Sequence, residues 1–273
     1  MPARIKRQLP ITPLRWSAGK ARAASDAVAV EEPLEIRLGG RRFTITMRTP
    51  GDDEELAAGF LHAEGFINSR AELGEIRRVR DAKGSPEPNA LDIVLNIPAD
   101  GLRERLSRNF TINSSCGICG RTSIESLARR ISPIDDDLRV RAHMILAIAP
   151  KLRTAQQVFA ATGGLHAAAR FDRAGEMLAI REDIGRHNAV DKIVGHALMN
   201  DQLPLAGKVM MVSGRLSFEI VQKAAAAGVP ILAAVSAPSS LAVELAEEVG
   251  LTLIGFLREG GFNIYTHPNR VIA

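Results

Sequence analysis

Residues 209–256, VMMVSGRLSFEIVQKAAAAGVPILAAVSAPSSLAVELAEEVGLTLIGF, decide the fold of the chain. Three short apolar runs within them predict buried strands, at Val209–Val212, Ile231–Val235 and Leu251–Phe256. Amphipathic stretches lie between these runs and predict helices over 216–227 and 239–249. Because neighbouring parallel strands need a crossover connection, this alternation indicates an α/β fold with a largely parallel sheet covered on both faces.

The same alternation extends upstream of this stretch. The expected elements there are a helix over Lys151–Ala161 ended by Gly163 and Gly164, strands at Leu165–Phe171 and Met177–Ile180, and a helix over 186–198. Polar residues Asp172–Glu176 supply the turn between the two strands. The second half of the chain therefore reads as one continuous α/β unit.

The first half has a different pattern. Apolar and polar residues alternate in Leu34–Leu38 and Phe43–Met47 on either side of Gly39-Gly40, which predicts a β-hairpin. Thr49 as N-cap and Pro50 at the first helical position predict a helix that ends near Gly65. Two more strands are expected, at Glu75–Arg80 and Leu91–Ile97. This half is therefore expected to be α+β.

Pro133 and the acidic run that ends at Asp137 interrupt the periodicity and mark the expected domain boundary. We expect three units: a basic flexible tail over 1–28, an α+β domain over 29–134 that ends in a two-cysteine loop and its helix, and an α/β domain over 135–273.

The net charge of +4 belongs to the start of the chain. Residues 1–25 hold six basic side chains and no acid, and residues 26–273 hold 29 basic against 31 acidic side chains. A basic stripe for nucleic acid on the folded body is therefore not expected. The tail lacks the apolar core of a secretion signal, and the longest apolar stretch, Ala224–Val235, is too short and broken to span a bilayer. With two cysteines only three positions apart, these features predict a cytoplasmic protein with no membrane partner.

The strongest local signal is the cysteine pair in Ser114-Ser115-Cys116-Gly117-Ile118-Cys119-Gly120. Thiols at this spacing can form a disulfide, supply half of a zinc site, or carry sulfur as a persulfide. The following helix start and Arg121 favour the thiolate over the thiol. A zinc ion usually needs four ligands, and the chain has no other cysteine, so no permanently bound metal is expected.

A polar cluster, Arg181 to Lys192, lies at an expected strand-to-helix junction. Asp183, His187 and Asp191 follow one another at intervals of four and share one side of any helix that includes them. Ordinary helix capping explains most such clusters, but so many ionisable groups beside Gly185 favour a functional site modestly.

Two serine-rich loops, Ser213–Ser217 and Ser236–Ser240, follow successive strands and open helices. Free backbone N–H groups there can bind an anion, and the two loops together favour a phosphate-bearing ligand, although a plain N-cap is the better interpretation of each loop alone. His166 lies in a stretch that faintly resembles the zinc deaminase signature, but position 168 is Ala where that chemistry needs Glu.

Taken in order, these motifs resemble one family, the formate dehydrogenase accessory sulfurtransferases or FdhD sulfur carrier proteins. The motifs that carry the resemblance are Arg48–Asp52 with Gly59–Leu61, Ser115–Gly120, Thr162–His166, Glu182–Lys192, Ser213–Arg215, Phe256–Arg258 and Phe262–Thr266. They extend over roughly residues 30–270, nearly everything except the tail.

The resemblance implies a fold, a ligand and a sulfur carrier. The second domain would be a cytidine-deaminase-like three-layer α/β/α domain, in a homodimer. Its ligand would be a molybdenum (or tungsten) bis-guanine-dinucleotide pterin cofactor, with GDP as a partial mimic. Cys116 would carry the persulfide and Cys119 would be the supporting thiol. Sulfur would come from a cysteine desulfurase and serve a formate dehydrogenase apoenzyme, so the chain would be a sulfurtransferase.

The family's cofactor-binding segment corresponds to Phe256, Leu257, Arg258, Glu259, Gly260 and Gly261. At the position of Gly261, members of the family often have a second basic residue. Weaker candidates for cofactor contact are Arg186, His187, Ser213, Gly214, Arg215 and His166. Arginine side chains suit pyrophosphate because the guanidinium binds two oxygens at once.

Two readings from other classes remain open. In one, the chain is a guanine-nucleotide-binding regulator whose cysteines sense redox state. In the other, it is a structural dimer stabilised by zinc at the cysteines.

Overall fold

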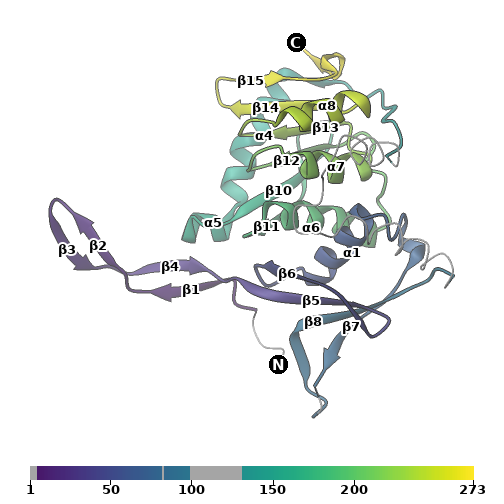
Figure 1. Ribbon diagram of the computed structural model, residues 1–273. Helices are drawn as coiled ribbons and strands as arrows, with labels where there is room; N and C mark the ends of the chain where they lie inside the picture. Colours follow the sequence, from purple (N-terminus) through teal and green to yellow (C-terminus); the bar gives the residue numbers. More distant parts are fainter. Residues whose placement is uncertain (1–4, 82, 99–130) are drawn as a thin grey trace.

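The computed structural model describes residues 5–81, 83–98 and 131–273, and a six-stranded sheet lies at its centre (Figure 1). The strand order is β11-β10-β12-β13-β14-β15. The strands are β10 (His166–Phe171), β11 (Met177–Asp183), β12 (Val209–Val212), β13 (Ile231–Ala234), β14 (Thr252–Arg258) and β15 (Gly261–Ile264).

Only the middle of this sheet is parallel. Strands β12, β13 and β14 run in parallel, and the pairings β10–β11, β10–β12 and β14–β15 are antiparallel. The expectation of a largely parallel sheet is therefore wrong. The reason lies in the connections, because β10–β11 and β14–β15 are joined by short turns, which permit only antiparallel pairing.

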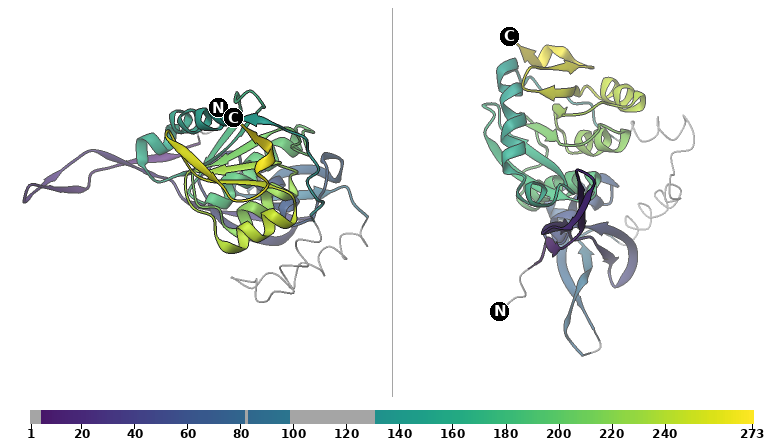
Figure 2. Two further views of the ribbon diagram at one scale, coloured as in Figure 1. Left: turned by 90° about the horizontal axis from the view of Figure 1, so that it is seen from above. Right: turned by 90° about the vertical axis from the view of Figure 1, so that its left-hand side faces the viewer.

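Helices cover both faces of this sheet. On one face α6 (Arg186–Met199), α7 (Phe218–Ala226) and α8 (Ser240–Glu248) pack against Met210 and Val212 of β12. On the other face α4 (Ala142–Ala155) packs against Val209 and Met211 of the same strand, and it is followed by α5 (Gln157–Thr162). The right-hand view of Figure 2 shows the sheet between these layers. The predicted three-layer α/β/α class is confirmed, and its likeness to cytidine deaminases stays a prediction.

The N-terminal part is a second, four-stranded sheet in the order β6-β5-β8-β7. Its elements are β5 (Glu32–Leu38), β6 (Arg41–Arg48), α1 (Asp53–Ala63), the short helix η1 (Arg70–Glu72), β7 (Leu73–Arg80) and β8 (Pro86–Leu95). The predicted hairpin is present, with Gly39 and Gly40 at positive φ in its turn. Helix α1 covers one face of this sheet, where Leu56 and Leu61 meet Leu34 and Ile36.

The two parts meet where α1 crosses α6. Gly59 and Gly195 lie at the crossing, and a Cβ added to Gly195 would stand 1.8 Å from the backbone oxygen of Glu55. The helices therefore touch through their backbones. Leu198 of α6 also belongs to the core cluster of the N-terminal sheet, so both parts share buried surface.

Residues 8–29 do not form the expected flexible tail. They form a projecting ribbon of two antiparallel pairs, β1 (Gln8–Ile11) with β4 (Asp26–Ala29) and β2 (Leu14–Ser17) with β3 (Lys20–Ala23) (Figure 1). Basic side chains do not prevent this pairing, because strand hydrogen bonds involve only the backbone and the charges project to solvent. We call residues 8–29 the arm.

Two helix predictions fail locally. Helix α1 begins at Asp53 rather than after Thr49, because Thr49 is used elsewhere: its N–H donates to Asp183 Oδ2 at 3.1 Å and its Oγ1 accepts from the N–H of Ile184 at 3.2 Å. The helix expected over 151–161 is instead the end of α4 and the whole of α5, separated at Gln156.

Near the C-terminus the short helix η2 (Pro268–Arg270) precedes β16 (Val271–Ile272), which pairs with β9 (Val140–Arg141). In the described part of the chain, no helix combines the length and apolar character needed to cross a membrane.

Candidate functional site

Three predicted segments meet along one edge of the six-stranded sheet, where the parallel strands β12, β13 and β14 end. Ser213 follows β12, and its Oγ accepts a hydrogen bond from the N–H of Ala167 at 2.8 Å. The loop after β13 joins this row through Leu216 N–H, which donates to Ala237 O at 3.1 Å. Phe256 completes it by donating its N–H to Ser236 O at 3.2 Å. We call this row the carboxyl edge, the usual place for ligands in open α/β sheets.

A cluster of cations surrounds His166 at the β10 end of this edge. Gly214 lies directly against it, because a Cβ there would stand 3.4 Å from His166 Nδ1 and 3.7 Å from Arg186 Cβ. Burial lowers the pKa of His166, and the nearby charges of Arg186, His187 and Arg215 lower it further. His166 is therefore a neutral hydrogen-bonding group at neutral pH, and the arginines supply the positive charge.

Arg186 has spare hydrogen-bonding capacity in this cluster. Its Nε is buried and has no partner among the described residues. An unpaired buried donor is costly, and an anion at the cluster would satisfy it. His187 is committed instead, because its Nε2 lies 2.8 Å from Glu219 Oε2 and 3.4 Å from Ser217 Oγ. The hydrogen bond from His187 lowers the pKa of Glu219 and keeps it ionised.

The predicted polar cluster 181–192 divides between two roles. Arg186 and His187 face the carboxyl edge, whereas Asp183 holds the N-terminal part in place. Its carboxylate accepts from Lys192 Nζ at 2.8 Å and from Asn188 Nδ2 at 3.0 Å, and both Asp183 and Lys192 are fully buried. Asp191 is paired with Lys223 at 2.8 Å. The capping and packing interpretation therefore fits the two aspartates.

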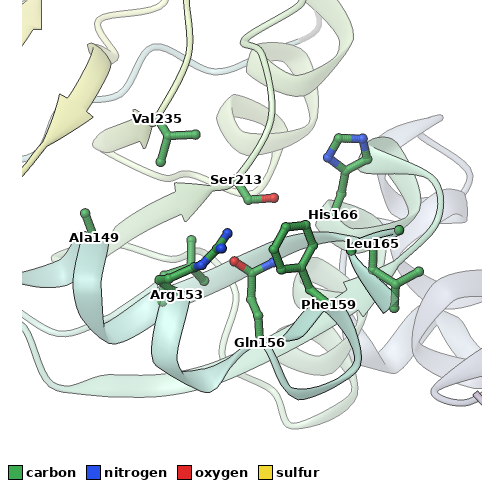
Figure 3. Close-up of a pocket in the computed structure, with 11 residues that line it drawn as sticks. Ala149, Arg153, Gln156, Phe159, Leu165, His166, Ser213 and Val235 are labelled. Atoms are coloured by element: carbon green, nitrogen blue, oxygen red, sulfur yellow. The ribbon is translucent and has the colours of Figure 1, made fainter. Parts of the chain in front are cut away.

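A cavity of about 270 Å³ opens beside this cluster, between the sheet and the helices α4 and α5 (Figure 3). Arg153 of α4, Phe159 of α5 and Gln156 between the two helices line one side of it. His166 of β10 and Ser213, which follows β12, line the other. The guanidinium carbon of Arg153 lies 4.5 Å from the centre of the Phe159 ring. Glu182 fixes this wall, since its carboxylate accepts from the N–H groups of Val158 and Phe159 at the start of α5.

Gln156 is the polar group that this cavity leaves unsatisfied. Its side chain is buried, with 3% of the residue exposed, and its Nε2 donates to no described group. The sequence contained a signal for it. Ile145, Ile148 and Leu152 form the buried stripe of α4, and the next position of that stripe is a glutamine. A polar residue at an apolar position marks a candidate ligand contact.

The predicted segment Phe256–Gly261 forms the hairpin between β14 and β15 at the sheet edge. Phe256 is 39% exposed and has a φ of 52°, at the point where the β14–β15 register shifts. Leu257 is buried in the core and offers no side chain to a ligand. Arg258 is exposed and forms no ion pair with Glu259 or any other described residue. The exposed turn holds Glu259 and Gly260.

Cys116 and Cys119 lie outside the described residues, so their predicted role stays a prediction. The remaining candidates are described. The structure brings His166, Ser213, Gly214, Arg186 and Arg215 together and adds Arg153, Gln156 and Phe159, which the motifs did not indicate.

Comparison with known proteins identifies relatives over nearly the whole chain. The model of the FdhD/NarQ family matches residues 29–272. The sulfur carrier protein FdhD of Mycolicibacterium paratuberculosis is 51% identical over 259 residues, covering 93% of this chain and 95% of the relative. The protein of the same name from Saccharolobus solfataricus is 48% identical over 261 residues, covering 94% and 96%.

A solved structure shares the fold. It is described as a formate dehydrogenase accessory protein from Desulfotalea psychrophila, with a TM-score of 0.77 at 24% identity over 98% of this chain and 100% of that one. Since the family model covers most of the chain and the relatives are about half identical to it, the chain belongs to the FdhD/NarQ family.

Proposed function

We propose that this chain is a sulfurtransferase that accepts persulfide sulfur from a cysteine desulfurase on Cys116. It passes that sulfur to a molybdenum or tungsten bis-guanine-dinucleotide pterin cofactor before the cofactor enters formate dehydrogenase. The names of the relatives support sulfur carriage, and that of the structural neighbour supports the link to formate dehydrogenase.

The observation that carries the ligand assignment is the cavity lined by the unpaired Gln156 amide, next to the His166 cluster in which Arg186 Nε has no described partner. Its volume of about 270 Å³ lies just under the usual range of about 300–1,000 Å³ for small-molecule sites, so it suits one heterocycle of a larger ligand. The Gln156 amide can bind the polar edge of that heterocycle, and the Phe159 ring offers a stacking surface.

The charges next to the cavity suit the rest of such a ligand. A bis-guanine-dinucleotide carries two pyrophosphates, and Arg186, Arg215 and Arg258 are exposed or unpaired cations along the same edge. Guanidinium groups bind phosphate oxygens in pairs, which is stronger than a single charge–charge contact. Neutral His166 adds a hydrogen bond without adding charge.

The sulfur chemistry uses two thiols of this chain. The Cys116 thiolate attacks the outer sulfur of the donor persulfide, and the donor cysteine leaves as a thiolate, so sulfur moves with no net oxidation. Cys119 then attacks the inner sulfur of the Cys116 persulfide. A disulfide forms, and the outer sulfur leaves as sulfide towards the metal of the cofactor. An external thiol must reduce the disulfide before the next cycle.

Intact mass spectrometry tests this function. After incubation with a cysteine desulfurase and cysteine, the wild-type chain should gain about 32 Da, one sulfur atom, as a persulfide. Cys116→Ala should gain nothing, and the matched variant Cys119→Ala should load normally but fail to activate apo-formate dehydrogenase.

The same experiment separates the alternatives. If neither wild type nor Cys119→Ala gains sulfur while both still bind GDP tightly, the result would favour the redox-sensing regulator and contradict sulfur transfer. Loss of folding in Cys116→Ala, together with one zinc ion per dimer in the reduced wild type, would favour the structural dimer. We further propose that the chain is a homodimer that works in the cytoplasm.

A further inference from the structure

Helix α5, which forms part of the cavity wall, is not held in place by a buried face of its own. It has six residues, Gln157–Thr162, and none of them is buried. Gln156, which precedes it, gives no side-chain cap. A helix this short is not stable by itself in water, so contacts with other elements must fix its position. Because Phe159 and the following Gly163 and Gly164 line the cavity, the same contacts determine the shape of the cavity.

One buried carboxylate holds the start of α5. Glu182 of β11 is 6% exposed, and its carboxylate accepts from the N–H of Phe159 at 2.8 Å and from the N–H of Val158 at 3.0 Å. The first N–H groups of a helix have no partner within the helix, so this carboxylate satisfies two donors that would otherwise be free. The position of Glu182 therefore sets the position of α5.

Arg7, at the base of the arm, holds Glu182 in turn. Its Nη2 donates to the backbone oxygen of Glu182 at 3.1 Å and to Asp52 Oδ2 at 3.3 Å. The guanidinium thereby links the end of β11 to the residue before α1. The backbone of Arg7 is fixed as well, since its carbonyl oxygen accepts from the N–H of Val30 at 3.0 Å. Arg7 can therefore act on α5 through Glu182.

The inner strand of the arm also touches α5 directly. Among the described elements, β4 has the most extensive contact with α5, and the two lie close together in Figure 1. A Cβ built on Gly164 would stand 3.5 Å from Ala29 Cβ, which is ordinary van der Waals contact. The arm therefore supports both the helix and the glycine turn that follows it.

We propose that Arg7 is a positioning residue of the ligand site, which holds Glu182 and the arm so that α5 keeps Phe159 at the cavity. Arg7 is not among the residues that line the cavity, so its effect is indirect. It also precedes residues 29–272, the region that the family model matches. The inference rests on the proposed function for the identity of the ligand, a guanine dinucleotide, but not for the contacts that position α5.

Hydrogen–deuterium exchange of the ligand-free full chain tests these contacts. In Arg7→Ala the backbone N–H groups of residues 157–163 should exchange at least about threefold faster, because Glu182 and β4 lose their anchor. Peptides from β12 and β13 should exchange as in wild type. Arg7→Lys can still donate to the backbone oxygen of Glu182 and should restore slow exchange. The matched control is Arg15→Ala, since the exposed Arg15 pairs with Asp26 at 3.8 Å within the arm, and it should exchange as wild type does.

Titration calorimetry with GDP tests the consequence for binding. If α5 is in place only about a tenth of the time, the apparent affinity falls by the same factor, so Arg7→Ala should raise the dissociation constant for GDP about tenfold. Arg7→Lys and Arg15→Ala should stay within about twofold of wild type, because both keep the contact with Glu182. A residue that only stabilised the fold would instead speed exchange throughout the sheet.

Three outcomes would overturn the proposal: unchanged exchange of residues 157–163 in Arg7→Ala, equal acceleration in β12, or equal GDP affinities of Arg7→Ala and Arg15→Ala when wild type binds GDP. If wild type does not bind GDP, the proposed ligand is wrong, and the exchange measurement still decides whether Arg7 positions α5. Sulfur loading of wild type reports separately on the proposed sulfur transfer.

Discussion

Replacing Gln156 with leucine should stabilise the ligand-free protein and weaken its ligand binding at the same time. Gln156 is 3% exposed, and its Nε2 has no hydrogen-bond partner in the described chain. Leucine has a similar volume and no polar group, so the substitution removes an unsatisfied donor from the interior. The same donor is the one that we assign to the heterocycle in the cavity.

The size of both effects follows from this burial. An unsatisfied buried donor costs about 1–3 kcal/mol, so Gln156→Leu should add about that much to the free energy of unfolding. For a chain of this length, each kcal/mol raises the melting temperature by about 2–4 °C, which gives a rise of roughly 2–12 °C. Loss of the hydrogen bond should weaken GDP binding about tenfold or more.

Thermal unfolding without ligand and titration calorimetry with GDP measure the two effects on one preparation. The matched control is Gln157→Leu, since Gln157 is the adjacent glutamine and is exposed. The control should leave the affinity for GDP unchanged. A lower melting temperature for Gln156→Leu would refute our account of the unpaired amide, and unchanged GDP affinity would refute its role in binding.

Arg258→Ala should weaken GDP binding about tenfold to hundredfold, which corresponds to about 1.5–3 kcal/mol. The melting temperature and the sulfur loading should not change, because Arg258 has no described partner to lose. Equal GDP affinities of variant and wild type in titration calorimetry would count against this prediction. Gly195→Ala should lower the free energy of unfolding by about 3 kcal/mol or more, because its Cβ would overlap the backbone of the crossing helix. The control Gly260→Ala has open space around the new Cβ and should have the melting temperature of wild type. Burial lowers the pKa of His62, so the unfolded chain binds the proton more readily than the folded one and stability should fall as the pH drops below about 6.5. Urea unfolding at several pH values checks this, and a His62→Gln variant with an undiminished slope would assign the effect to other groups.

The sequence predicted elements whose signals are local. Strands β12, β13 and β14 are short apolar runs, and the helices between them have clear amphipathic periods, so their positions are confirmed within a few residues. The hairpin at Gly39 and Gly40 was equally predictable, because its turn chemistry lies within two residues.

The features that the sequence did not predict depend on contacts between distant residues. Thr49 has every local feature of an N-cap, but its backbone N–H donates a hydrogen bond to Asp183, which is 134 positions away in the sequence. The arm has the composition of a disordered tail, and only cross-strand pairing makes it a ribbon. Arg153 and Phe159 reach the cavity because α4 packs across the sheet, which no local pattern encodes. Gln156 alone carried a readable signal, as a polar residue in a buried stripe.

The crossing of α1 and α6 through Gly59 and Gly195 determines how the molecule can move. Side chains at a helix interface allow sliding, because they can change rotamer as the helices shift, but two backbones in contact have no such freedom. We therefore expect the N-terminal sheet and the first turn of α6, which bears Arg186 and His187, to move together. Close backbone contact at this joint therefore predicts that the cation cluster keeps its orientation to the N-terminal sheet when a ligand binds.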